Sequence, residues 1–433
     1  MPSAMFLNMH MSRLNFAAWA ELHSQIPLHE ADDRKVITHL THLEDLVITK
    51  YGTGAQEALR VLRGVASSLL GSAASPVNIT VKIDGAPAIV AGNDPADGKF
   101  FVGTKGAFAK TPKIAKSEAD LKTLYGAKPG LLTTMQTAFR TLKNMNFPSI
   151  LQGDVLFTPE IKQDQTIDGQ VHVTFKPNTI VYGVPKSSEL GKKFTSATFG
   201  VCFHTTYTGS TLQTLSATPG ANISQLRPPT NVALVSSQYQ DLSGTLTFTA
   251  SESQSLKTLI ADVARRTPLL TQNAFVKELK EVPLLQSEFM IFQNSLVRGG
   301  EPITLSPKVF VQRFVAYLQS RAAALAGTKK TPAGKATATN KYESLAMLVT
   351  AREDALVDVL AWQQSVTGAK TYLINKLNQR GSLGTFYSSD TGLVAGPHEG
   401  FVASDKSGNF VKLVDRSVFS QMNLTQGRFR TPA

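Results

Sequence analysis

A change in the spacing of apolar residues divides this chain and limits its fold more than any other feature. Between residues 77 and 207, short runs rich in Val, Ile, Thr and Phe alternate apolar with polar positions, which predicts β-strands. From Ser251 to about Arg380 the apolar spacing is helical, and after Gly381 strand-like runs return. We therefore predict an α+β fold in which a large helical insertion interrupts an antiparallel β-rich core. The expected strands are 77–83, 88–91, 99–104, 149–157, 171–175, 179–184 and 197–207, with helices between them at 118–125 and 131–145.

The pattern predicts four regions along the chain. They are a helical segment at 1–75, the first part of the β-rich core at 76–250, a basic helical insertion at 251–380 and the last part of the core at 381–433. In the first region, His39 and His42 are three residues apart in an apolar-periodic segment, which is more typical of partly buried imidazoles than of a metal site. In the insertion, residues 326–335 are rich in Gly, Thr and Lys and predict a flexible basic linker.

The composition is that of a globular protein without a membrane span. Hydrophobic residues make up 42% of the chain and charged residues 18%. No apolar run reaches the length of about 18 residues that a transmembrane helix needs. A single cysteine, Cys202, excludes an internal disulfide and a site built from several thiolates. Since the first residues also lack the pattern of a signal peptide, we expect a cytoplasmic protein.

The net charge of +12 and the isoelectric point near 9.6 indicate an acidic partner. Nucleic acid is the commonest such partner, and the alternative is a basic surface without a specific role. Residues 251–380 hold 17 Lys and Arg against 10 Asp and Glu, so the insertion carries much of the excess. We expect it to bind a polynucleotide through residues that include Lys329, Lys330, Lys335, Lys370 and Lys376, with Tyr372 as a stacking surface.

The first expected strand ends in Lys82-Ile-Asp84-Gly85, which places a lysine immediately before a turn. Lysine can act as a nitrogen nucleophile when burial or neighbouring positive charge lowers its pKa. Glycine in the turn allows backbone to approach a ligand closely. The structural alternative is a hairpin with an exposed lysine, and the motif alone does not decide between the two.

Four further stretches in the β-rich regions fit beside this lysine. Two carry carboxylates, Gly153-Asp154-Val155 and Glu399-Gly400-Phe401. The third, Phe199 to His204, places an aromatic residue in an apolar strand, and the fourth places Lys412 on the last strand. Each has an ordinary structural explanation, because strand-end carboxylates are usually solvated and strand phenylalanines usually belong to a core.

In their order along the chain, these stretches resemble the motif series of covalent nucleotidyltransferases, the superfamily of ATP-dependent polynucleotide ligases and mRNA capping enzymes. The resemblance covers roughly 75–210 and 384–416. The phrases Val81-Lys-Ile-Asp-Gly-Ala-Pro-Ala-Ile, Gln152-Gly-Asp-Val-Leu-Phe and Phe203-His-Thr-Thr-Tyr are also similar to a bacteriophage family described as RNA ligase-like. The resemblance implies an antiparallel β-rich, ATP-grasp-like ligase core and, if the phage origin holds, action in the infected host's cytoplasm.

The resemblance also implies a role for each matched residue. Lys82 would attack the α-phosphorus of ATP and form a lysyl-adenylate, inside a nucleotide-binding loop that includes Val81, Asp84 and Gly85. Lys105 and Asp154 would lie near the ribose, and Phe203 would stack on adenine. Glu399, with Asp154, would bind Mg²⁺ or Mn²⁺, and Lys412 would contact the α-phosphate. The chemistry requires such a set, because metal ions and lysines must neutralise the charge that develops during phosphoryl transfer.

Three departures from the family pattern bear on the substrate. His204 stands where many members have Asp. The final motif commonly has two lysines one residue apart, whereas Val414 stands at the second position here, with Lys406 or Arg416 as possible substitutes. Only 17 residues follow Arg416, so we expect no C-terminal OB-fold. We therefore predict an ATP-dependent RNA ligase that joins 5′-phosphate to 3′-hydroxyl ends. The alternatives are a DNA ligase, a capping-type guanylyltransferase, and an inactive nucleic-acid-binding phage protein.

Overall fold

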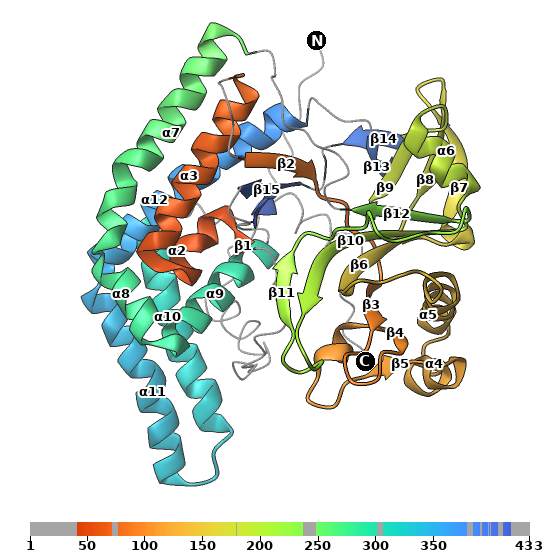
Figure 1. Cartoon of the computed structure of the whole chain (residues 1–433). Coiled ribbons are helices and arrows are strands. Elements are labelled where there is room, and N and C mark those ends of the chain that lie inside the picture. Colours follow the sequence, from red (N-terminus) through yellow and green to blue (C-terminus); the bar gives the residue numbers. More distant parts are fainter. Residues whose placement is uncertain are drawn as a thin grey trace, which may run out of the picture. The chain divides into compact units, whose positions relative to one another are not determined.

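The computed structural model describes most of the chain between residues 41 and 416. The described residues are 41–71, 77–178, 180–236, 248–299, 301, 306–378, 384–389, 392–396, 398, 400–405 and 410–416. Within them the protein is a mixed α+β protein, with three β-sheets and a helical region of six helices after the main run of strands (Figure 1). The α+β class predicted from the spacing of apolar residues is confirmed.

The described residues divide into two compact units. The helical unit contains residues 269–362, and the β-rich unit contains the rest, from residue 41 to 268 and from 363 to 416. The first boundary falls at Pro268, inside helix α7 (Ala250–Thr271), where the missing N–H of proline removes one helical hydrogen bond. The helical unit is thus shorter than the predicted insertion at 251–380, because the outer parts of its first and last helices belong to the β-rich unit.

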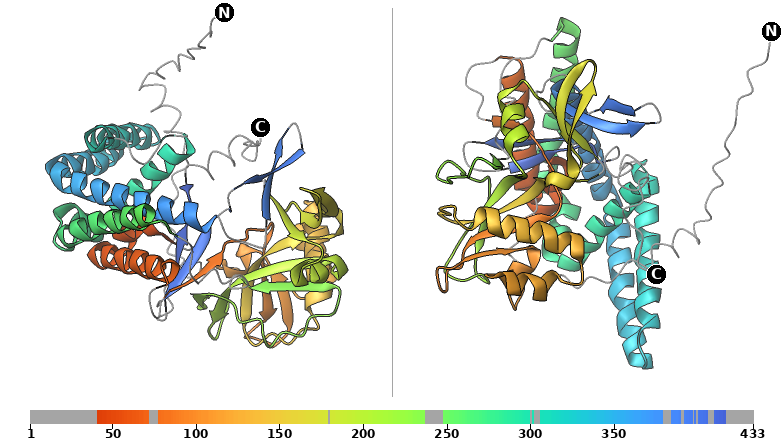
Figure 2. Two further views of the ribbon diagram at one scale, coloured as in Figure 1. Left: turned by 90° about the horizontal axis from the view of Figure 1, so that it is seen from above. Right: turned by 90° about the vertical axis from the view of Figure 1, so that its right-hand side faces the viewer.

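A four-stranded sheet in the β-rich unit joins three distant parts of the sequence. Its strand order is β1 (Thr41–His42), β16 (Phe410–Leu413), β15 (Phe401–Asp405) and β2 (Val77–Val81). Helix α3 (Tyr51–Leu69) contacts β2 and β15. In β2, Ile79 and Val81 are buried apolar residues at alternate positions, and Thr80 between them is buried as well. Figure 2 shows this sheet beside α3 in two further views.

A seven-stranded sheet forms the centre of the β-rich unit. Its members are β3 (Ala88–Asn93), β4 (Phe100–Gly103), β5 (Ile114–Ala115), β6 (Ile150–Phe157), β10 (Phe199–Thr208), β11 (Ser216–Pro219) and β12 (Val232–Ser236). Helices α4 (Glu118–Tyr125) and α5 (Pro129–Leu142) pack on one face, where Leu121, Phe139 and Leu142 share a core with Leu151 and Val155. Both helices lie close to the predicted positions.

A five-stranded sheet completes the β-rich unit. Its order is β14 (Gly392–Gly396), β13 (Gly384–Ser389), β9 (Val181–Pro185), β8 (Gln170–Phe175) and β7 (Lys162–Ile167). Helix α6 (Glu189–Ser196) contacts β8 and β9, and its N-cap Ser188 accepts a hydrogen bond from the amide of Gly191 at 3.0 Å. The spacing of apolar residues did not reveal β7 or α6, since both are short and rich in polar residues.

The helical region contains α7, α8 (Ala274–Glu281), α9 (Pro283–Arg298), α10 (Pro307–Gly327), α11 (Pro332–Ala351) and α12 (Glu353–Leu377). Helices α10 and α11 pack against each other as a long hairpin (Figure 2). The predicted flexible linker at 326–335 is therefore wrong: α10 ends at Gly327, and α11 begins at Pro332, where Thr331 caps its first turn. Among the helices of the described residues, none combines the length and the apolar character needed to cross a membrane.

The N-terminal region is only partly helical where the structure describes it. Residues 1–40 of the predicted helical segment lie outside the described residues. From there the chain forms β1, a short 3₁₀ helix η1 (Leu43–Asp45), α2 (Leu46–Thr49) and α3. His42 therefore belongs to a strand rather than to the predicted helix.

Candidate functional site

Lys82 follows strand β2, and its side chain lies on the face of the four-stranded sheet opposite the buried Ile79 and Val81. Its side chain is 13% exposed and forms an ion pair with the carboxylate of Asp84, which is 34% exposed. The backbone amide of Lys82 donates a hydrogen bond to the carbonyl oxygen of Gly400 at 2.9 Å. The lysine is thus held at the end of a strand, where the sequence placed it, and its side chain is partly shielded.

The loop from Lys82 to Pro87 is attached to all three sheets. Lys82 bonds to Gly400, which precedes β15 of the four-stranded sheet. The amide of Ala86 donates to the carbonyl of Val155 in β6 of the seven-stranded sheet at 2.9 Å. The amide of Asp84 donates to the hydroxyl oxygen of Tyr182 in β9 of the five-stranded sheet at 3.1 Å. This loop therefore has hydrogen bonds to strands, or to the residue before a strand, in all three sheets.

Asn178 adds a further contact to the same loop. Its side-chain amide donates to the carbonyl oxygen of Asp84 at 2.8 Å, and its side-chain oxygen accepts from the amide of Ile180 at the same distance. Asn178 thereby fixes the Asp84 backbone against the segment that leads into β9.

Gly85 is required by the close approach of this loop to β6. A Cβ atom at Gly85 would lie 2.1 Å from the carbonyl oxygen of Val155 and 3.0 Å from the Cβ of Asp154, closer than non-bonded atoms tolerate. The sequence interpretation gave this glycine the role of allowing close approach to a ligand, whereas the structure shows a close approach to the strand that carries Asp154.

Lys412 lies on the same face of the four-stranded sheet as Lys82. In the strand register, Lys412 is paired with Val402, and Val402 is paired with Thr80. Directly paired residues share a face, and Lys82 follows Thr80 by two positions, so all four side chains point the same way. Two lysines that are distant in the sequence therefore lie on one face of one sheet, separated by a single strand.

The seven-stranded sheet contributes Asp154, Cys202 and His204 to the surroundings of Lys82. Asp154 is paired with Ala88 on one side and Cys202 on the other. The His204 Nε2 atom lies 3.8 Å from Asp154 Oδ1. Burial, together with the negative charges of Asp154 and Asp84, raises the pKa of the Cys202 thiol far above its usual value. The thiol is therefore protonated and does not serve as a nucleophile.

Phe203 does not lie where the adenine-stacking role requires it. Its ring is fully buried and packs edge-on against Phe147 at 6.1 Å between ring centroids, inside the core that α5 covers. Asp154 is on the other face of this sheet, because its neighbour Val155 belongs to that core. The prediction for Phe203 is corrected accordingly: it is a core residue in this structure.

The structure also describes Val81 and Lys105, the two other residues predicted to contact the nucleotide. The side chain of Val81 is buried with Ile79, away from Lys82, so Val81 can meet a nucleotide only through its backbone. Lys105 is exposed in a 3₁₀ helix, η2 (Lys105–Phe108), that follows β4. Since Val90 is paired with Gly103, the chain leaves β4 beside Ala88, at the end of β3 nearest Asp154. This position is compatible with the ribose role predicted for Lys105.

Glu399, the predicted metal ligand, lies outside the described residues, although its neighbour Gly400 is described. Gly400 has φ +156°, and a Cβ there would lie 2.4 Å from the Val414 side chain, so this position also favours glycine. Among the described residues, no group of three or more His, Cys, Asp or Glu side chains is placed to hold a metal ion. A metal ion would therefore depend on other oxygen ligands in addition to Asp154.

A buried ionic network lies beside Lys412. Glu44 accepts two bonds from the Lys370 ammonium, both 2.8 Å, and Arg416 donates to both oxygens of Asp45 at 2.9 and 2.8 Å. Burial alone would raise the pKa of Glu44, but the charges of Lys370 and Arg416 hold it below its usual value. Burial raises the pKa of Asp45 to about 6 against the opposing effect of Arg416.

This network bears on whether Arg416 can replace the second lysine of the last motif. Arg416 is occupied by Asp45, and Val414 is buried. Lys406, the other possible substitute for a second lysine, lies outside the described residues. In the described structure Arg416 therefore supports the sheet rather than taking the place of a second phosphate-binding lysine.

The basic residues predicted to bind a polynucleotide fall into two groups. Lys370 is buried against Glu44, and Lys376 is buried against the carboxylate of Glu252, so neither is available at the surface. The Tyr372 hydroxyl donates to the backbone oxygen of Glu252 at 2.9 Å, which leaves this ring only partly exposed. In contrast, Lys329, Lys330 and Lys335 are exposed where α10 meets α11. We call these three residues the hairpin-tip lysines.

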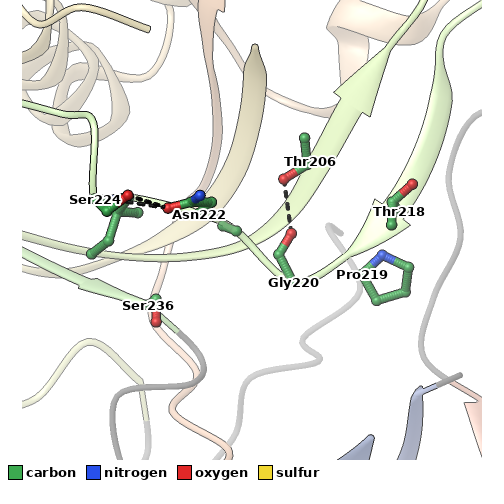
Figure 3. Close-up of a pocket in the computed structure, with 9 residues that line it drawn as sticks. Thr206, Thr218, Pro219, Gly220, Asn222, Ser224 and Ser236 are labelled. Atoms are coloured by element: carbon green, nitrogen blue, oxygen red, sulfur yellow. Dashed lines mark hydrogen bonds between the residues drawn. The ribbon is translucent and has the colours of Figure 1, made fainter. Parts of the chain in front are cut away.

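A separate hollow of about 750 Å³ opens where β10, β11 and β12 meet (Figure 3). Its lining includes Thr206, Thr218, Asn222, Ser224 and Ser236, and the Thr206 hydroxyl donates to the carbonyl oxygen of Gly220 at 2.8 Å. None of the residues that line it has an ionisable side chain. It therefore cannot neutralise a polyphosphate, and we place the candidate site at Lys82.

Sequence reasoning assigned no site role to three residues that the structure brings to the site. Tyr182 and Asn178 hold the Asp84 backbone, and His42 is paired with Lys412 on β1. The segment from Lys176 to Tyr182 contains Asn between proline and a strand, which is a turn signal that could have indicated Asn178. No local signal indicates His42, because its partner strand lies near the other end of the chain.

Comparison with known proteins gives one family. A family of unknown function, DUF6267, matches residues 37–428, which is most of the chain and includes every residue of the candidate site. No curated protein and no solved structure matches the chain. The chain therefore belongs to the DUF6267 family.

Proposed function

We propose that the protein is an ATP-dependent nucleotidyltransferase of the polynucleotide ligase type, with an RNA ligase as the first expectation. The observation that carries the proposal is the placement of Lys82 and Lys412 on one face of the four-stranded sheet, next to the Asp84 loop and Asp154. A nucleophile beside a second cation and two carboxylates is the arrangement that transfer of a nucleoside monophosphate from ATP requires.

In the proposed reaction, the Lys82 ammonium releases a proton to water, and the Nζ atom of the neutral amine attacks the α-phosphorus of ATP and gives up a second proton to water. An N–P bond forms, the bond to the bridging oxygen breaks, and pyrophosphate leaves. Lys412 would stabilise the charge on the α-phosphate during this exchange. Because the loop is attached to all three sheets, Lys82 would already be oriented, and little conformational entropy of the loop would be lost when the nucleotide binds.

Asp84 would hold the Lys82 ammonium in place before the reaction, since their side chains already form an ion pair. Asp154 and Glu399 would supply carboxylate oxygens to the Mg²⁺ or Mn²⁺ that accompanies ATP. Magnesium prefers oxygen ligands and commonly takes one or two from protein carboxylates and the rest from phosphate and water. The described residues fit that kind of site, because Asp154 is 16% exposed and lies beside the loop.

The substrate that receives the AMP would be a polynucleotide with a 5′-phosphate. The hairpin-tip lysines, exposed and without a carboxylate partner among the described residues, are the surface that we assign to its backbone. RNA ligases of phage often lack the OB-fold of DNA ligases and capping enzymes, which is why RNA comes first. An ATP-dependent DNA ligase is second, and a capping-type guanylyltransferase is third.

One observation favours a protein that binds nucleic acid without catalysis. The last motif has the buried Val414 at its second lysine position, and Arg416 is occupied by Asp45. If no other group supplies that charge, the transfer of AMP would be slow or absent while the basic surface would remain.

The test is covalent labelling. The full chain is incubated with Mg²⁺ and ATP, GTP or NAD labelled on the adenylate or guanylate phosphate, and then separated by denaturing electrophoresis. We expect label from ATP on the parent protein and none on Lys82→Ala. Lys122→Ala, an exposed lysine on α4, is the matched control and should label as the parent does. Label that persists in Lys82→Ala, or preferential loading from GTP, would contradict the proposal.

The substrate class is tested with the labelled protein. Single-stranded 5′-phosphorylated RNA, single-stranded DNA and nicked duplex DNA are each added, and joined products are measured. An RNA ligase joins the RNA ends, whereas preference for the nicked duplex would establish the DNA ligase alternative. Full binding with no labelling from any nucleotide would establish the non-catalytic alternative.

A further inference from the structure

His42 lies beside Lys412 at the edge of the same sheet face that carries Lys82. Strand β1 pairs with β16 in parallel, and His42 is the residue paired with Lys412. The order of strands therefore places His42, Lys412 and Lys82 along one face of one sheet. Neither the spacing of motifs nor the family resemblance assigns a role to this histidine.

The ring of His42 makes no hydrogen bond to the described residues. Its Nδ1 atom is buried without a partner, while the residue as a whole is partly exposed. A buried lone pair without a donor costs less than a buried N–H without an acceptor, so the neutral ring carries its hydrogen on Nε2. Nε2 is then the ring nitrogen that can donate one hydrogen bond to a ligand.

The charges around this ring are mainly positive. Burial, and then the charges of Arg416, Lys370, Lys412 and Lys82, lower the pKa of His42 well below its usual value, so the empty site holds a neutral ring. Three of these cations are already in ion pairs, Lys370 with Glu44, Arg416 with Asp45 and Lys82 with Asp84. Lys370 and Arg416 belong to the buried ionic network, and Lys412 and Lys82 lie on the sheet face that His42 shares.

A neutral hydrogen-bond donor near several cations is well suited to an anion that binds and dissociates. A fourth charged side chain at this position would repel the lysines while the site is empty. An imidazole avoids that cost, and a multiply charged anion can restore its proton once bound. The anion must carry several negative charges to match this surface, which a polyphosphate does.

We propose that His42 Nε2, together with Lys412 and Lys82, binds the polyphosphate chain of the nucleotide, and that the ring is the contact for the phosphates that leave as pyrophosphate. The assignment rests on the proposed nucleotidyltransferase function for its ligand. It adds to that function a residue from the N-terminal strand and makes β1 part of the binding site.

The test uses inorganic pyrophosphate, which needs no catalysis. The full chain is prepared with isotope-labelled histidine, and the His42 signal is assigned by its loss in His42→Gln. Saturating pyrophosphate should shift the His42 signal and raise its titration midpoint, while His172, whose Nδ1 contacts the Gln170 carbonyl oxygen, should not move. A 5′-phosphorylated dinucleotide should produce a smaller shift. A larger shift with the dinucleotide would overturn the polyphosphate assignment.

Binding measured by calorimetry gives the second readout. His42→Ala removes the donor and should weaken pyrophosphate binding about tenfold or more, as expected for a hydrogen bond to a charged group. His42→Gln places an amide N–H near the position of Nε2 and should stay within about threefold of the parent. Thermal melts without ligand show whether either variant has lost its fold. The magnetic resonance experiment is carried out on the parent protein and needs a variant only to assign the His42 signal.

The two proposals fail separately. If pyrophosphate moves His42 but Lys82 never takes up AMP, the anion site stands and the nucleotidyltransferase function fails. If Lys82 is adenylated but pyrophosphate leaves the His42 signal unchanged, or the parent does not bind pyrophosphate, the function stands and the role of His42 is overturned.

Discussion

The hydroxyl oxygen of Tyr182 accepts a hydrogen bond from the backbone amide of Asp84 at 3.1 Å. Tyr182 is fully buried on β9, in a sheet that carries none of the residues proposed to react. Through this bond the five-stranded sheet helps to fix the loop that presents Lys82. The chemistry of the site is therefore expected to depend on a residue that touches no substrate.

Replacing Tyr182 by Phe should slow adenylation while the fold is retained. The substitution leaves the Asp84 amide without its acceptor, which costs about 1–3 kcal/mol for a buried group and releases the loop. We expect the labelling rate to fall about tenfold, since small displacements of a reacting group are costly. Tyr342→Phe removes a buried tyrosine hydroxyl that donates to Glu288 in the helical unit, and it should leave labelling unchanged. Equal labelling of the two variants would contradict the positioning role of Tyr182.

Replacing Gly85 by Ala should reduce both stability and labelling. The new Cβ would lie 2.1 Å from the Val155 carbonyl oxygen, so β6 or the loop must move. Overpacking of this kind costs about 1–3 kcal/mol, measurable by urea unfolding. Gly130→Ala is the control, because its Cβ would meet nothing within 4 Å and the residue is in helix α5. The control should be at least as stable as the parent. If Gly85→Ala is as stable as the parent and labels as well, the loop or β6 can move to admit the new Cβ atom without loss of stability.

Asp262 should stabilise the protein in a pH-dependent manner. The hydrogen bond from Ser365, followed by those from Arg265 and Arg266, lowers the pKa of Asp262 from 3.8 to about 2. A lowered pKa favours the folded state above pH 4, and this contribution is lost as the pH falls from about 4 to about 2. Because the side chain is 36% exposed, we expect Asp262→Asn to cost only about 1 kcal/mol at pH 7.

Unfolding measured between pH 3 and pH 7 checks this expectation. The difference in unfolding free energy between Asp262→Asn and the parent should hold down to about pH 4 and shrink as the pH falls from there to 3. Asp358→Asn, at an exposed position of α12, should differ little from the parent throughout. A constant difference at all pH values would show that the ion pairs and the Ser365 bond are not its source.

The hairpin-tip lysines should determine how salt affects polynucleotide binding. Changing Lys329, Lys330 and Lys335 together to Gln should weaken binding of single-stranded RNA and lower the salt slope by about 0.7 for each lost phosphate contact. Adenylation should be unaffected, because these residues belong to the helical unit. The control changes Lys257, Lys277 and Lys280 to Gln, which removes the same charge from other exposed positions. If both triple variants bind alike, the effect is one of net charge alone.

The sequence predicts those parts of the fold that depend on local patterns. Helix α4 and strand β6 lie close to their expected positions, because a capping residue such as Ser117 and a run of strand-forming apolar residues act within a few positions. Lys82 at a strand end follows from the same local logic. None of these inferences required knowledge of distant contacts.

The remaining features depend on contacts between distant segments. Period-two alternation shows that Phe203 and His204 point to different faces, but not which face the helices cover, and the register of β10 also shifts between Phe203 and Thr205. Lys370 resembles a surface lysine in the sequence, and only the fold shows it buried against Glu44. The pairing of His42 with Lys412 brings together strands from nearly opposite ends of the chain.

That pairing has a consequence for protein synthesis. The sheet face that holds Lys82 is completed only when residues 410–413 pair with both β1 and β15. On the ribosome, β2 and its lysine emerge long before these residues exist, so a nascent chain would display the nucleophile without its opposing cation. Formation of the site is thus coupled to translation of almost the whole chain, and a product truncated before residue 410 would lack Lys412.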